Sequence, residues 1–169
     1  MNYHDIVHDD LKNGDGIRVT LFVSGCEHHC PKCQNPQTWH YNSGIRFDED
    51  TFSELFIEMS KDYISGLTIS GGDPLAPQNV EKILEIVSKF KKIFPNKTIW
   101  IYTGYKYEQL LFEGKFNVIQ ILKHTDVLVD GKYIEEKRDI NLKWRGSSNQ
   151  RVIDVQKSLK ELKAVPWSD

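Results

Sequence analysis

Three cysteines form the densest group of chemically reactive side chains in the sequence. Cys26, Cys30 and Cys33 are the only cysteines among 169 residues, and their spacing is C-x3-C-x2-C. Thiolate is a soft ligand that suits iron–sulfur clusters, zinc and copper(I). Three thiolates on one short loop can hold three corners of a [4Fe–4S] cluster and leave the fourth iron open to a substrate or cofactor. An electron carrier of the ferredoxin type would need a fourth cysteine, which this chain lacks.

Two other uses of the cysteines compete with a cluster. His28 or His29 could complete a Cys3His zinc site, but structural zinc ligands usually come as two pairs separated by a longer loop. A disulfide framework is disfavoured because the number of cysteines is odd and the first residues lack the basic and apolar regions of a signal peptide. The spacing therefore favours a cluster over zinc, and it assigns the histidines to the loop or to the outer shell.

The composition is that of an ordinary globular domain. Hydrophobic residues make up 39% and charged residues 27% of the chain. A formal net charge of −2 argues against a broad nucleic-acid-binding surface. No stretch approaches the ~18 apolar residues of a membrane span. We therefore expect one cytoplasmic domain, residues 1–169, that binds neither nucleic acid nor membrane.

Strand-like and helix-like segments alternate along the chain. Strands are expected at 17–23, 66–70, 98–103, 126–129 and 151–155, and helices at 48–61, 79–94, 106–112, 115–124 and 156–163. This alternation predicts right-handed βαβ units and a parallel sheet. The units are too few for a closed eight-stranded barrel of about 250 residues. The predicted fold is α/β, with a parallel sheet that forms an incomplete (β/α) barrel in a single compact domain.

Further polar residues follow two of the predicted strands. Gly71, Gly72 and Asp73 come after strand 66–70, and Asp130 and Lys132 come after strand 126–129. Since the cysteine loop follows strand 17–23, all of them are expected at the carboxyl edge of the sheet, where α/β proteins bind ligands. Backbone carbonyls of the glycines and Asp73 would suit an ammonium group, Lys132 a carboxylate, and Asp130 a hydroxyl or a cation. A plain turn and solvated charges are the alternative interpretation.

Taken together, these motifs resemble the radical S-adenosylmethionine (radical SAM) superfamily. Its signature is C-x3-C-x2-C after the first strand, and Gly71–Pro74 is similar to its G-G-E-P motif with Asp in place of Glu. The chain is most similar to the family that activates anaerobic ribonucleoside-triphosphate reductases. The matching stretches are 20–26, 70–75, 100–105, 126–133 and 144–150, so the resemblance covers nearly the whole chain.

The resemblance implies a radical SAM domain in which Cys26, Cys30 and Cys33 hold a [4Fe–4S] cluster and SAM chelates the open iron. The glycine turn with Asp73 would orient the SAM amino group, Lys132 its carboxylate, and Asp130 the ribose or a cation. The backbone of residues 32–34 would lie by the adenine, although Lys32 stands where many members have an aromatic residue. The residues implied to bind SAM are Lys32, Cys33, Gln34, Gly71, Gly72, Asp73, Asp130 and Lys132.

The resemblance also implies an oxidoreductase with a protein substrate. A flavodoxin or ferredoxin would reduce the cluster, and SAM would be cleaved to methionine and a 5′-deoxyadenosyl radical. That radical would take a hydrogen from a glycine of the large subunit of the reductase and leave a glycyl radical there. Because this glycine lies in a polypeptide, the site needs an open mouth, and we expect residues 144–150 near it. The alternatives are an activase of another glycyl-radical enzyme and a non-enzymatic zinc-binding adaptor.

Overall fold

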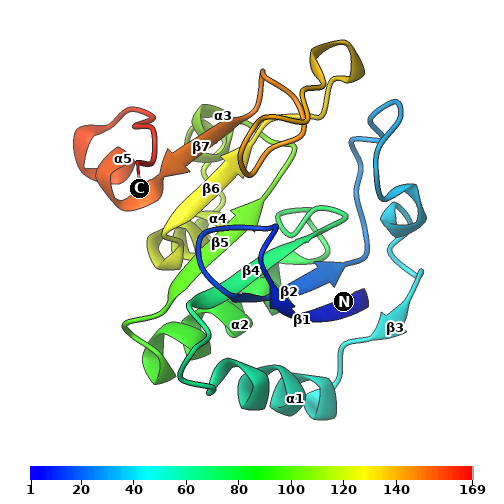
Figure 1. Cartoon of the computed structure of the whole chain (residues 1–169), viewed down its shortest axis with the longest axis vertical. Helices are drawn as coiled ribbons and strands as arrows, with labels where there is room; N and C mark the ends of the chain where they lie inside the picture. Colours follow the sequence, from blue (N-terminus) through cyan, green and yellow to red (C-terminus); the bar gives the residue numbers. More distant parts are fainter. Residues whose placement is uncertain (169) are drawn as a thin grey trace.

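A seven-stranded mixed sheet organises the chain in the computed structural model, which describes residues 1–168 (Figure 1). The spatial order is β3-β1-β2-β4-β5-β6-β7, and the sheet stays open. The strands are β1 (Asn2–Asp10), β2 (Arg18–Val23), β3 (Ile45–Arg46), β4 (Gly66–Gly71), β5 (Thr98–Tyr102), β6 (Val127–Asp130) and β7 (Arg151–Asp154).

The prediction of a parallel sheet is confirmed for the four central strands and wrong for the outer ones. β2, β4, β5 and β6 are parallel, whereas β1, β3 and β7 pair antiparallel with their neighbours. The links before β2 and before β7 contain no α-helix, and a parallel return normally needs one. β1 and the two-residue β3 were both missed. The polar sequence of β1 shows no alternation, and its strand conformation depends on pairing with β2.

The predicted helices are confirmed with small shifts of their ends. Two of them begin at an aspartate that caps the first turn, as Asp48 accepts from Thr51 N (2.9 Å) and Asp154 from Lys157 N (3.0 Å). The helices are α1 (Glu49–Met59), α2 (Val80–Ile93), α3 (Tyr107–Phe112), α4 (Phe116–His124) and α5 (Val155–Glu161), with two 3-10 turns, η1 (Pro36–Thr38) and η2 (Glu135–Lys137).

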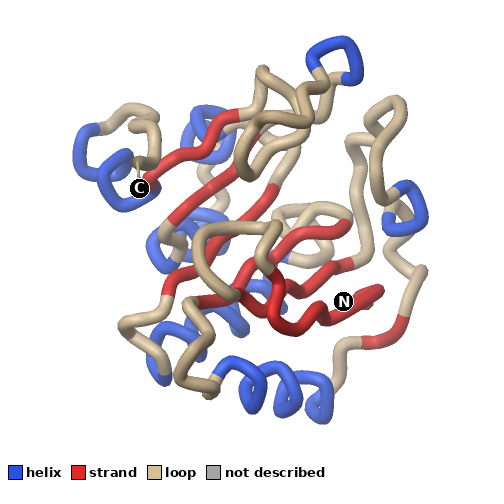
Figure 2. The backbone as a smooth tube through the Cα atoms, in the orientation of Figure 1, coloured by secondary structure: helices blue, strands red, loops and turns tan. Residues whose placement is uncertain are grey.

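The two faces of the sheet have different roles. Successive side chains of a strand point to opposite faces, and one face is apolar, with Leu21, Ile69 and Ile101 packed in the main core. The helices α1, α2 and α4 cover this face (Figures 1 and 2). The opposite face carries a smaller cluster around Trp100, which contacts the rings of Trp144 and Trp167 at 5.5 and 5.0 Å. This second face therefore holds both polar and aromatic side chains, and the candidate site lies over it.

Within the described residues, no helix is both long enough and apolar enough to cross a bilayer.

A fully buried arginine on the second face joins three strands. The Arg18 guanidinium donates to the hydroxyls of Thr68 (2.8 Å) and Thr98 (2.9 Å) and to three main-chain carbonyls at 2.9–3.0 Å. Its carbon lies 5.5 Å from the Trp100 ring centroid, and burial lowers its pKa to about 10. All five N–H groups of the guanidinium therefore have protein acceptors.

We predict that Arg18→Met lowers the free energy of unfolding by about 3 kcal/mol, because each buried acceptor left unpaired costs about 1–3 kcal/mol. Urea unfolding monitored by circular dichroism measures this loss. Arg46→Met is the matched control, since Arg46 is an exposed strand residue and surface substitutions stay within about 0.5 kcal/mol. Equal losses in both variants would contradict the structural role of Arg18.

Candidate functional site

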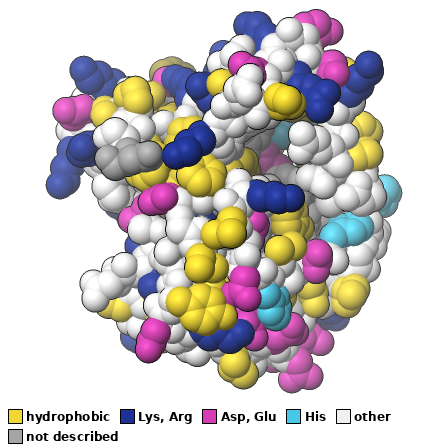
Figure 3. Space-filling view, viewed as in Figure 1, with side chains coloured by type: hydrophobic (Ala, Val, Ile, Leu, Met, Phe, Trp, Pro, Cys, Tyr) yellow, Lys and Arg dark blue, Asp and Glu magenta, His cyan; other side chains and the backbone are white. Residues whose placement is uncertain are grey.

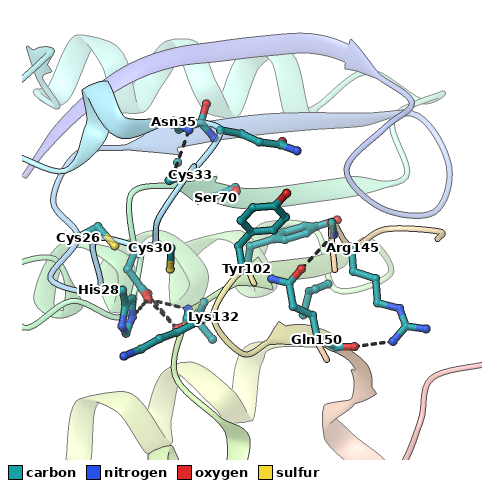
Figure 4. A pocket seen from close by; sticks show the side chains of 18 of the residues that line it. Cys26, His28, Cys30, Cys33, Asn35, Ser70, Tyr102, Lys132, Arg145 and Gln150 are labelled. Atoms are coloured by element: carbon teal, nitrogen blue, oxygen red, sulfur yellow. Dashed lines mark hydrogen bonds and ion pairs between the residues drawn. The ribbon is translucent and has the colours of Figure 1, made fainter. Parts of the chain in front are cut away.

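A cavity of about 530 Å³ lies at the carboxyl ends of the parallel strands. The cysteine loop forms one side of it and the segment 142–150 the other, and the surface is hollowed between them (Figure 3). Figure 4 shows the three cysteines facing Tyr102, with Arg145 and Gln150 beyond it. The structure therefore brings together the cysteine loop, the glycine turn after β4 and the loop after β6, as the sequence predicted.

Backbone hydrogen bonds set the start of the cysteine loop. The N–H of Gly25 donates to Thr38 O (2.7 Å), and the N–H of Cys26 donates to Trp39 O (2.9 Å). These bonds pair the first residues of the loop with the end of η1, so the chain turns back on itself directly after β2. All three sulfur-bearing residues then line the cavity, and none forms a disulfide.

The surroundings of the sulfurs fit a cluster. The N–H of Asn35 points at Cys33 Sγ (3.4 Å). Burial raises the pKa of Cys26 to about 11, while the amides of His28 and His29 act in the opposite direction. Burial also raises the pKa of Cys30, against the amide of Tyr133. Backbone N–H groups near thiolate sulfurs are typical of iron–sulfur sites, and ligation would displace the thiol protons.

Both histidines of the loop have partners other than sulfur. His28 Nε2 lies 2.7 Å from Asp73 Oδ2, and the His29 ring stacks on Trp39 at 4.5 Å between centroids. Over residues 1–168, no three His, Cys, Asp or Glu side chains converge as closely as a single metal ion requires. The outer-shell and loop roles predicted for the histidines agree with this arrangement.

The glycine turn lies against the cysteine loop with no space for side chains. A Cβ on Gly71, whose φ is +106°, would lie 2.5 Å from Val23 N and O, and one on Gly72 would lie 2.5 Å from Gly25 O. In return, Gly72 N donates to Val23 O (2.8 Å) and Asp73 N to Gly25 O (2.7 Å). Only glycine permits this approach, and both glycines line the cavity.

The Asp73 carboxylate forms its hydrogen bonds within the protein. Its side chain is 1% exposed. It accepts from Leu75 N and Gly104 N (both 2.9 Å), from the Thr103 hydroxyl (2.9 and 3.0 Å) and from His28. A carboxylate offers about four acceptor positions. Internal donors therefore already occupy the positions at which an ammonium group was expected to bind.

Asp130 and Lys132 point in different directions. Asp130 is buried, accepts from Tyr107 N (2.8 Å) and from Arg151, and lines a second cavity of about 450 Å³ instead of the cysteine cavity. Arg151 also binds Glu108 (2.7 Å). Lys132 is exposed and lines both cavities, and Figure 4 shows it beside Cys30. The side chain of Asp130 therefore holds the start of β7, whereas Lys132 is available to a ligand.

Only two of the three residues expected near adenine line the cavity. Among the described residues, Cys33 and Gln34 contribute to its wall, but Lys32 does not. Lys32 is exposed, and its φ is +59°. Its contribution to the loop is therefore a left-handed backbone turn between two cysteines.

Two residues that hold the site together, Thr103 and Gly104, were not among those predicted from the sequence. Both residues follow β5 and donate hydrogen bonds to Asp73. The other motifs were identified because they follow predicted strands, and the same criterion applied to strand 98–103 would have identified these two. Gln150 organises the far rim, since its Oε1 accepts from Gly146 N (3.0 Å) and its Nε2 donates to Gly131 O (3.0 Å). The rim segment 144–150 lies at the cavity, where the sequence predicted it.

Comparisons with known proteins agree with these features. Residues 12–153 match the model of a family described as a 4Fe-4S single cluster domain. The chain is 47% identical to a protein of Enterobacteria phage T4, over 90% of this chain and 93% of that protein. Its identity is 44% to a protein of Escherichia coli K12 (90% and 97% covered) and 43% to one of Haemophilus influenzae (89% and 96% covered). All three are named anaerobic ribonucleoside-triphosphate reductase-activating protein, and the chain belongs to this family.

Proposed function

We propose that this chain is a radical SAM enzyme that generates the glycyl radical on the large subunit of an anaerobic ribonucleoside-triphosphate reductase in the cytoplasm. The observation that carries the proposal is the set of three cysteines, with no fourth in the sequence, on the wall of a cavity of about 530 Å³. Pockets for drug-sized ligands have volumes of about 300–1,000 Å³. The cavity therefore has room for a cofactor beside a cluster on Cys26, Cys30 and Cys33.

Cys26, Cys30 and Cys33 would hold the cluster, and a bound cluster, reduced by a flavodoxin or ferredoxin, would supply the electron for cleavage of SAM to methionine and a 5′-deoxyadenosyl radical, which would take a hydrogen from a glycine of the reductase. The residues of this chain supply binding and orientation. None of them is required as a general acid or base.

The structure supports a specific division of work among the residues proposed to bind SAM. Backbone groups of Gly71 and Gly72 would bind the amino group, and Lys132 would bind the carboxylate. The backbone at Cys33 and Gln34 would lie by the adenine. Three residues act indirectly: Asp73 closes its own turn by accepting from Leu75 N, Asp130 holds the start of β7 through Arg151, and Lys32 shapes the loop.

Two other functions remain as alternatives. An activase of a different glycyl-radical enzyme would use the same cavity, and the names of the relatives favour the reductase instead. A zinc-binding adaptor would place one ion on the cysteines, whereas the matching family is described by a 4Fe-4S cluster.

Cys30→Ala tests the cluster. We expect wild-type protein, reconstituted anaerobically with iron and sulfide and reduced with dithionite, to give a [4Fe–4S]+ electron paramagnetic resonance signal that SAM perturbs, and to form 5′-deoxyadenosine. The variant should lose more than about 100-fold in product, because even outer-shell partners contribute about 10–100-fold at metal sites. One zinc per wild-type chain, without a reduced-cluster signal or cleavage, would establish the adaptor instead.

Lys132→Met tests the carboxylate contact. We expect SAM to bind roughly 10- to 100-fold more weakly, because a hydrogen bond between charged groups contributes about 1.5–3 kcal/mol. Titration of the reduced cluster's spectrum with SAM measures the affinity. Lys137→Met is the matched control, since Lys137 comes from the same segment but lines only the second cavity. Similar losses in both variants would refute a specific role for Lys132.

Arg145→Ala tests the rim as the entrance for the partner. The guanidinium donates to Gln150 O and lines the cavity, so its removal loosens the far wall. We expect roughly tenfold less glycyl radical on the reductase, with cleavage of SAM in the absence of the reductase unchanged. Undiminished binding and activation of the reductase would remove this segment from the partner interface.

A further inference from the structure

The cysteine loop is poorly supported by its own backbone. Between residues 27 and 34, one backbone hydrogen bond is formed within the loop, from Cys33 N to Cys30 O (3.1 Å). Two non-glycine residues, His29 and Lys32, have φ values of +49° and +59°. The left-handed conformation costs roughly 1–2 kcal/mol for an ordinary residue. Contacts from outside the loop must therefore hold it in this shape.

One side chain of the loop reaches into the protein interior. The His28 side chain is 8% exposed, and its Nε2 lies 2.7 Å from the Asp73 carboxylate, which is 1% exposed. Because a carboxylate only accepts hydrogen bonds, Nε2 is the donor. The Tyr105 ring packs edge-on against the imidazole, with 4.5 Å between centroids. A Cβ on Gly104 would lie 2.4 Å from the same ring, so the imidazole fits tightly against this backbone.

The acceptor of this hydrogen bond is itself immobile. Asp73 is held by the backbone of Leu75 and Gly104 and by the Thr103 hydroxyl, so its carboxylate joins the ends of β4 and β5. The His28 ring is thereby tied to the two central strands. The backbone amides of His28 and His29 both act to lower the pKa of the Cys26 thiol. A fixed His28 ring therefore keeps these two N–H groups in place beside Cys26.

We propose that His28 is a positioning residue that, through Asp73, holds the cysteine loop in its ligand-binding shape before the cluster is bound. The inference rests on the proposed function in one respect, that this loop holds a cluster. In this proposal the buried Asp73 carboxylate anchors the loop, because it binds the imidazole of His28. The energetic benefit is preorganisation: a loop already in shape loses less conformational freedom on binding.

The proposal is tested with His28→Leu, which removes the donor, and His28→Gln, which restores one at a similar reach. In the protein before reconstitution, alkylation of Cys26 by iodoacetamide is followed by mass spectrometry. We expect the leucine variant to react roughly 10- to 100-fold faster than wild type, the range expected for the loss of one hydrogen bond to a charged group. After reconstitution, it should release iron to a chelator faster by a similar factor. The glutamine variant should return both rates to near wild type.

His29→Asn is the matched control, because it removes an imidazole from the same loop without touching Asp73, and asparagine tolerates the left-handed backbone of this position. Hydrogen exchange of β4 and β5 verifies that each variant is folded. Wild-type rates in His28→Leu, equal effects of His29→Asn, or no rescue by His28→Gln would each overturn the proposal. Alkylation is measured without cluster or SAM, so a failure of SAM cleavage leaves this result intact and the two hypotheses can be refuted separately.

Discussion

The site depends on the close approach of two backbone segments at the ends of β2 and β4. The turn after β4 donates from Gly72 N to the carbonyl of Val23, the last residue of β2, and from Asp73 N to the carbonyl of Gly25, at 2.8 and 2.7 Å. This approach leaves no room for a Cβ at Gly71 or Gly72. A side chain at either position would push the turn away from the loop. The cavity then would lose its shared wall of cysteines and glycines.

Asp73 extends this constraint to the next strand. Its carboxylate accepts from the end of β5 and from the cysteine loop while it closes its own turn. A buried carboxylate is costly unless donors surround it, and here those donors come from three segments far apart in sequence. The same hydrogen bonds that make its burial tolerable also set the relative positions of the segments. Stability and the geometry of the site are therefore properties of one network.

The sheet separates packing from chemistry by the alternation of its side chains. The face under α1, α2 and α4 is apolar and continuous with the main core. The other face carries Arg18 and Trp100 at one end of the strands and the cavity, with Ser70 and Tyr102, at the other. The aromatic contact of Trp100 with Trp144 connects this buried group to the rim. The rim is thus attached to the sheet although it contains little regular structure.

The sequence by itself determined the features that depend on local pattern or ligand chemistry. The spacing of the cysteines can be read from it directly. The central parallel strands, the helices and the gathering of strand ends at one edge could be predicted from it. Strand β1 could not, because its polar sequence becomes a strand only by pairing with β2. Nor could the orientations of Asp73 and Asp130, since a carboxylate after a strand looks the same whether it faces a ligand or a neighbouring segment. Their donors, from the cysteine loop, the end of β5 and the start of β7, are distant in sequence, so only the tertiary structure decided which way each carboxylate points.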